Sequence, residues 1–150
     1  QNLKESDYPS WLKNVGLVIM CGCYAALYGA TLLEMFVAGI AAIVLPFVYK
    51  LDAKLGLGMF ITNLVSIIPI VIIICFLQAN VFPSIHIGIP IIGAIMPAVP
   101  GTAITNAIRD TLRGDYNSGT ARAVEAAVTA LSISIAVAIG LLIGGGVNPL

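Results

Sequence analysis

The chain has 150 residues, of which 59% are hydrophobic and 9% are charged, and its mean hydropathy is +1.04. A soluble domain is about 45–50% apolar and about 25% charged, so a soluble fold of this length could not bury so much apolar surface. The formal net charge is +0 and there is no basic run, which argues against a nucleic-acid-binding protein. The composition predicts an all-α, polytopic membrane protein.

The hydropathy pattern predicts five transmembrane helices, because a helix needs about 20 apolar residues to cross the hydrocarbon core. Residues 1–10 are interpreted as a polar amino-terminal remnant, and residues 11–150 as one five-span domain. A polar turn is expected at 50–58. The expected spans are residues 12–30, 33–49 and 59–79, an irregular fourth stretch that begins near Ile85, and residues 123–144.

The fourth apolar stretch cannot be a regular helix throughout, because proline removes a backbone donor and clashes with the preceding turn. We expect it to break at Pro97, Pro100 and Gly101. A short amphipathic helix should then begin at Thr102 and stop at Gly114.

The basic residues favour the same topology. With five spans, all of them fall on one side of the membrane, and the positive-inside rule makes that side cytoplasmic. The amino end is therefore expected in the cytoplasm and the carboxyl end on the periplasmic or extracellular side. The basic residues are Lys4, Lys13, Lys50, Lys54, Arg109, Arg113 and Arg122.

Two polar stripes follow the expected break. Spacings of three and four residues place each stripe on one face of a helix. Ionisable groups in a membrane domain are costly, and they usually face protein or a water-filled cavity. The first stripe is Thr102, Thr105, Asn106, Arg109, Asp110 and Arg113, and the second is Ser118, Arg122, Glu125, Thr129 and Ser132.

These stripes predict a substrate site at a broken helix, a position that transporters often use. Free N–H groups at the new amino end would bind a carboxylate, which an arginine could also neutralise, while an acid could hold an ammonium group or carry a proton. The predicted substrate-binding residues are Gly101, Thr102, Thr105, Asn106, Arg109, Asp110, Ser118, Arg122 and Glu125. The predicted proton-coupling residues are Glu125, Asp110 and Glu34.

Simpler interpretations stay open. The arginines could only set topology, with Arg122 paired to Glu125 three residues later. The first stripe could face lipid headgroups, and Glu34 could be an interfacial acid. The polar residues Thr62, Asn63 and Ser66 indicate helix-to-helix hydrogen bonds or, alternatively, a cavity lining. No metal site, cofactor or enzyme motif is expected.

Residues 97–110, with the sequence PAVPGTAITNAIRD, resemble the threonine/serine exporter family. The resemblance rests on Pro-Gly, Asn-x-x-Arg-Asp, Gly-Asp, Ser-Gly, Ala-Arg and Glu-Ala, and it continues to residue 126. Gly29 and Glu34 at the first hairpin also fit the family.

This resemblance implies an inner-membrane secondary transporter that exports threonine, serine or related small carboxylates, driven by the proton gradient. Related two-component members are linked to dicarboxylates. It also implies a second five-span domain, fused or separate, or else a homo-oligomer. Because five is odd, a fused copy would be inverted, as in many alternating-access transporters. A soluble region usually precedes the first span, and it is mostly absent here. A passive channel and a structural subunit without its own site are the alternatives.

Overall fold

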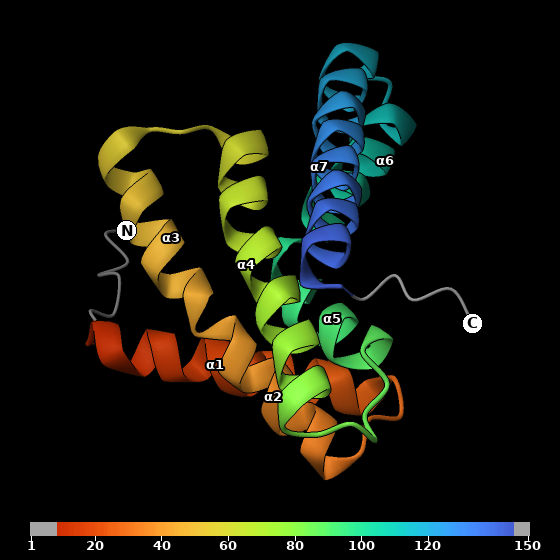
Figure 1. Ribbon diagram of the computed structural model, residues 1–150. Helices are drawn as coiled ribbons and strands as arrows, with labels where there is room; N and C mark the ends of the chain where they lie inside the picture. Colours follow the sequence, from red (N-terminus) through yellow and green to blue (C-terminus); the bar gives the residue numbers. More distant parts are fainter. Residues whose placement is uncertain (1–8, 146–150) are drawn as a thin grey trace.

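The computed structural model describes residues 9–145, and within that range it contains helices and no strands (Figure 1). The all-α prediction is therefore confirmed for this part of the chain. Most of the predicted amino-terminal remnant, including Lys4, lies outside the described residues. The elements are α1 (Ser10–Leu27), α2 (Leu32–Ala42), α3 (Val44–Leu55), α4 (Met59–Asn80), α5 (Gly88–Ile95), the 3-10 helix η1 (Met96–Ala98), α6 (Gly101–Leu112) and α7 (Tyr116–Gly144).

Three helical segments of the described range are long and apolar enough to cross a membrane: Leu32–Leu55, Met59–Asn80 and Tyr116–Gly144. A fourth span results if Gly88–Ala98 and Gly101–Leu112, which meet at 54°, are counted as one bent span. The apolar part of α1, Trp11–Leu27, is shorter and lies near the lower limit of about 17 residues for a span. The chain is a membrane protein with three or four candidate spans in the described range, and both the five-span topology and the broken fourth span stay predictions.

The expected span 33–49 is divided at Ile43 into α2 and α3, and two helix boundaries differ from the sequence-based expectation by six residues or more. Residues 50–55 were expected in a polar turn, but they form the last turns of α3, which ends at Gly56 with a left-handed φ of 61°. The helix that was expected to begin at residue 123 begins at Tyr116, because Asp115 caps it by accepting a hydrogen bond from the Ser118 N–H at 3.2 Å. Local caps, rather than hydropathy, set both boundaries.

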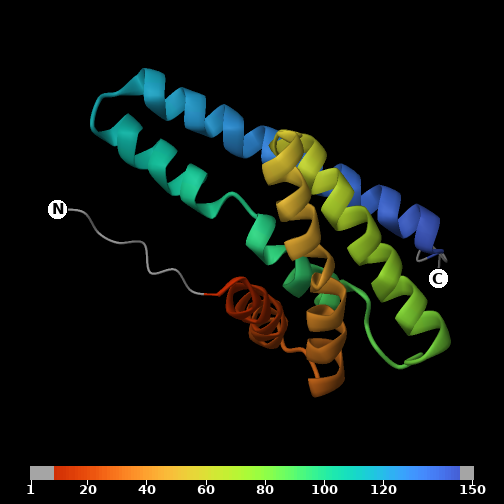
Figure 2. The same ribbon diagram turned by 90° about the vertical axis from the view of Figure 1, so that its left-hand side faces the viewer.

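The central contact of the fold joins α4 and α7, which lie side by side in both views (Figures 1 and 2). Glycines make the close approach possible. A Cβ atom added at Gly140 would lie 2.6 Å from Val71 Cβ, and one added at Gly144 would lie 2.8 Å from Cys75 Cβ. Small residues four apart allow membrane helices to pack tightly where no hydrophobic force drives their association.

Close contacts of the same kind place the other helices. α5 crosses α1 so tightly that a Cβ atom at Gly93 would lie 2.6 Å from Ala25 Cβ. α6 runs back along α7 as a helical hairpin, and a Cβ atom at Gly119 would lie 3.2 Å from the Ala107 carbonyl oxygen. The segment between α5 and α6 is therefore held between α1 and the hairpin (Figure 2).

We predict that Gly140→Ala destabilises the protein, because the new methyl group would overlap Val71 in a packed interface. Overpacking of this kind costs about 1–3 kcal/mol. Gly16→Ala in α1 is the matched control, since nothing lies within 4 Å of its Cβ position, and alanine should stabilise that helix by about 0.5–1 kcal/mol. Thermal unfolding of the purified protein in detergent would measure both changes. Equal stability of the two variants would contradict the close α4–α7 contact.

Candidate functional site

A cavity of about 710 Å³ lies at the break that precedes α6. Its walls come from α1, α3, η1 and the first turns of α6, so segments distant in the sequence meet there. The lining combines apolar side chains with phenol, hydroxyl and amide groups, and none of the lining residues is charged. These residues are Leu17, Met20, Tyr24, Tyr49, Met96, Pro97, Val99, Gly101, Thr102, Thr105 and Asn106.

The break itself follows from two prolines. Pro97 lies in the first turn of η1, and Pro100 is the residue before α6, where it has neither an N–H nor a side chain that could cap the helix. The Gly101 N–H donates a hydrogen bond to the Val99 carbonyl oxygen at 2.8 Å. Because Gly101 and Thr102 also line the cavity, the amino end of α6 opens onto it.

The structure brings together part of the predicted substrate-binding set. Gly101, Thr102, Thr105 and Asn106 share the cavity wall. The Thr105 hydroxyl donates to the Gly101 carbonyl oxygen at 2.8 Å, which leaves its oxygen able to accept a hydrogen bond from a ligand.

The charged members of the predicted set lie further along the hairpin, outside this lining. Arg122 Nε lies 3.0 Å from Asp110 Oδ2, so the two polar stripes meet through an ion pair between α6 and α7. The Asp110 side chain is 17% exposed and that of Arg122 is 46% exposed. The alternative pairing of Arg122 with Glu125 is therefore wrong. Arg109 and Glu125 are exposed, and neither takes part in an ion pair among residues 9–145.

A sequence model of the family described as "Putative threonine/serine exporter" (ThrE) matches residues 1–144 of the chain. The match includes the break, the cavity lining and the whole α6–α7 hairpin. The chain belongs to the threonine/serine exporter family. No curated protein and no solved structure matches the chain. Family membership confirms the resemblance to the threonine/serine exporters, and the cavity is therefore considered as part of an exporter domain.

Sequence reasoning missed the part of this exporter cavity that α1 and α3 provide. Tyr24 and Tyr49 contribute the phenol groups, and Leu17 and Met20 contribute apolar surface. A signal for the tyrosines was present, because a phenol hydroxyl within an apolar span needs a polar partner. Their proximity to α6, however, depends on the crossing of α1 and α5.

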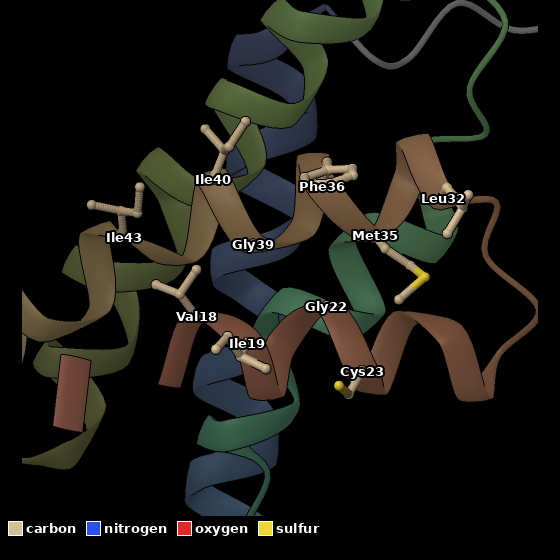
Figure 3. Close-up of a pocket in the computed structure, with 10 residues that line it drawn as sticks. All are labelled: Val18, Ile19, Gly22, Cys23, Leu32, Met35, Phe36, Gly39, Ile40 and Ile43. Atoms are coloured by element: carbon tan, nitrogen blue, oxygen red, sulfur yellow. The ribbon is translucent and has the colours of Figure 1, made fainter. Parts of the chain in front are cut away.

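A second hollow of about 340 Å³ lies between α1 and α2 (Figure 3). Figure 3 shows aliphatic, aromatic and sulfur-containing side chains around it, among them Ile19, Phe36, Ile40 and Cys23. A thiol behaves as a small hydrophobic group, so this groove offers a polar metabolite no hydrogen-bonding partners. It suits the hydrocarbon of the bilayer better than a substrate.

Glu34 is almost completely buried, with 2% of its surface exposed. One carboxylate oxygen accepts hydrogen bonds from the Thr31 N–H at 2.7 Å and the Thr31 hydroxyl at 3.0 Å. The first of these bonds, together with the Glu34 N–H donating to the Thr31 hydroxyl oxygen at 3.4 Å, forms a capping box at the start of α2. The other oxygen accepts from the His86 backbone N–H at 3.0 Å. These contacts give Glu34 a structural role, and its proton-coupling role stays a prediction.

The polar residues of α4 and α7 form hydrogen bonds within their packed interface. Asn63 Nδ2 donates to the Ser132 hydroxyl at 2.8 Å, which confirms a helix-to-helix hydrogen bond. The Ser66 hydroxyl donates to the Thr62 carbonyl oxygen at 2.7 Å, within its own helix. Both assignments favour packing over a cavity lining for this seam.

Ser118, another predicted substrate-binding residue, donates a hydrogen bond to Asp115, the residue that caps α7. Hydrogen bonds from its hydroxyl and its backbone N–H hold the pKa of the exposed Asp115 carboxyl below its usual value. Ser118 therefore helps to set the turn between α6 and α7.

We predict that Glu34→Gln lowers the thermal stability of the protein. The amide would direct donor hydrogens at the Thr31 or His86 N–H groups, and a lost buried hydrogen bond to a charged group costs about 1.5–3 kcal/mol. Glu125→Gln is the matched control, because the Glu125 side chain is exposed. Thermal unfolding in detergent should show a lower midpoint for Glu34→Gln alone. An unfolding midpoint equal to that of the control would show that the Glu34 hydrogen bonds do not stabilise the fold.

Proposed function

We propose that this chain is the membrane subunit or domain of a secondary transporter that exports threonine, serine or related small carboxylates, driven by the proton gradient. Membership of the exporter family supports the substrate class. The observation that carries the proposal is the cavity of about 710 Å³ at the break before α6. A cavity that combines apolar walls with a few convergent polar groups is typical of a small-molecule site.

The proposed substrate lies at the amino end of α6. The Thr102 backbone N–H binds its carboxylate, aided by the positive end of the helix dipole, while the Gly101 N–H donates to the Val99 carbonyl oxygen. Asn106 and Thr105 supply further hydrogen-bonding groups in the same wall. Broken helices in transporters commonly hold anionic substrate groups in this way.

Proton coupling in this proposal acts through the hairpin. Asp110 and four of the residues that line the cavity belong to α6, and Arg122 joins that helix to α7 through its ion pair with Asp110. Protonation of Asp110 removes the negative charge that Arg122 contacts, so the hold of α7 on α6 weakens. Glu125, exposed on α7, is the proposed carrier that receives the proton from solvent.

The proposed topology has five spans: α1, α2 with α3, α4, α5 with α6, and α7. The amino end is cytoplasmic and the membrane is the inner membrane, since this arrangement gathers the basic residues on one side. Tyr49, which lines the cavity, precedes Lys50, one of the basic residues on the proposed cytoplasmic side. This position suits uptake of substrate from the cell interior. A second five-span domain or subunit, or a second copy of the chain, completes the transporter.

We predict that Glu125→Gln abolishes export while leaving the protein folded, because glutamine cannot carry the proton. Efflux of labelled threonine from cells, normalised to the amount of protein in the membrane, would measure the loss. The cavity itself is tested by Asn106→Ala, which should reduce efflux by about tenfold. If Glu125→Gln exports with the wild-type pH dependence, the proton-carrier role is wrong. If alanine variants of Arg109, Asp110, Arg122 and Glu125 all export normally, the hairpin has no role in transport.

We also predict that a reporter fused after residue 150 reports a periplasmic location. An odd number of spans places the two ends of the chain on opposite sides of the membrane. A phosphatase fusion, active only outside the cytoplasm, and a fluorescent-protein fusion, active inside, would give opposite signals. A cytoplasmic reading at the carboxyl end would rule out five spans with a cytoplasmic amino end.

A further inference from the structure

Two tyrosines bring phenol groups into the cavity before α6. Tyr24 comes from the second half of α1, where it is half-buried, and Tyr49 comes from the second half of α3, where it is 37% exposed. Thr102, Thr105 and Asn106 line the same cavity from α6. The polar groups of the cavity therefore come from three separate helices, which is the arrangement of a site that holds a ligand by more than one end.

The charge of this lining limits what can bind. No lysine, arginine, histidine, aspartate or glutamate is among the residues that line the cavity. Arg122 is engaged by Asp110 at 3.0 Å. A dicarboxylate would bring two negative charges into a neutral and largely apolar space, and burying unpaired charge is strongly unfavourable.

A zwitterion fits the same cavity better than a dicarboxylate does. Its net charge is zero, and its carboxylate can use the amino end of α6. Its ammonium group needs acceptors or an aromatic face, and a phenol supplies both: the oxygen accepts a hydrogen bond, and the ring attracts a cation. The apolar residues Leu17, Met20 and Val99 leave room for a short aliphatic side chain.

We propose that Tyr24 and Tyr49 receive the ammonium group of the exported amino acid, and that this contact, in a lining without charged residues, makes the cavity reject dicarboxylates. This inference rests on the proposed function and sharpens it, because the family resemblance leaves amino acids and dicarboxylates both open. It assigns the specificity of the site to residues of α1 and α3, which lie outside the motif around the break.

The test is binding to the full chain in lipid nanodiscs, measured by calorimetry with L-threonine, 3-hydroxybutyrate and succinate. Threonine and 3-hydroxybutyrate differ only in the ammonium group. Tyr24→Phe and Tyr49→Phe keep the ring and lose the hydroxyl, so each should weaken threonine binding by about tenfold. Neither substitution should change the affinity for 3-hydroxybutyrate, and succinate should not compete with threonine in the wild type.

Tyr28→Phe and Tyr116→Phe are the matched controls, because both tyrosines are exposed and outside the cavity lining. They should bind threonine like the wild type. Equal loss of threonine and 3-hydroxybutyrate binding in the Tyr24 and Tyr49 variants would indicate a structural effect and overturn the ammonium assignment. Succinate that competes as well as threonine would overturn the selectivity.

Asn106→Ala separates failure of this inference from failure of the proposed function. If it weakens threonine binding while both tyrosine variants bind normally, the cavity is the site and the tyrosines have no part in it. If wild-type protein binds none of the three ligands, and Asn106→Ala leaves efflux unchanged, the proposed site is wrong and the tyrosine assignment falls with it.

Discussion

Close backbone contact at glycine is the constraint on which this structure depends. In lipid, apolar side chains gain nothing by leaving the solvent, so helices associate through close packing and hydrogen bonds. Gly140 lets α7 approach α4, Gly119 lets α6 approach α7, and Gly93 lets α5 cross α1. Together, these three contacts place the break before α6 beside α1. The cavity is a consequence of this sequence of contacts.

Much of the helical pattern could be predicted from the sequence, because each apolar run is set by local composition. The break was also predictable, since Pro97 and Pro100 act on the backbone directly. The start of α7 and the end of α3 depended on caps that hydropathy does not weigh. The part of the cavity that α1 and α3 line could not be predicted, because the positions of Tyr24 and Tyr49 depend on helix crossings between residues far apart in the chain.

The hairpin separates two kinds of polar chemistry that appeared as one stripe in the sequence. The first turns of α6 present uncharged groups to the cavity, whereas its later turns carry Asp110 toward Arg122 on α7. A neutral site spares the protein the cost of burying a charge next to the substrate. The ion pair is partly exposed and lies outside the cavity lining. Since both belong to one helix, a change at the pair can reach the site through a rigid element.

The two glutamates of the described range show why burial alone is a poor guide to function in such a protein. Glu34 is the more buried, and an intramembrane acid is by default a functional candidate. Its two oxygens, however, accept three hydrogen bonds, from the Thr31 N–H, the Thr31 hydroxyl and the His86 N–H. Glu125, by contrast, has an exposed side chain on α7. The burial of Glu34 is therefore explained by the hydrogen bonds that join the start of α2 to the backbone at His86.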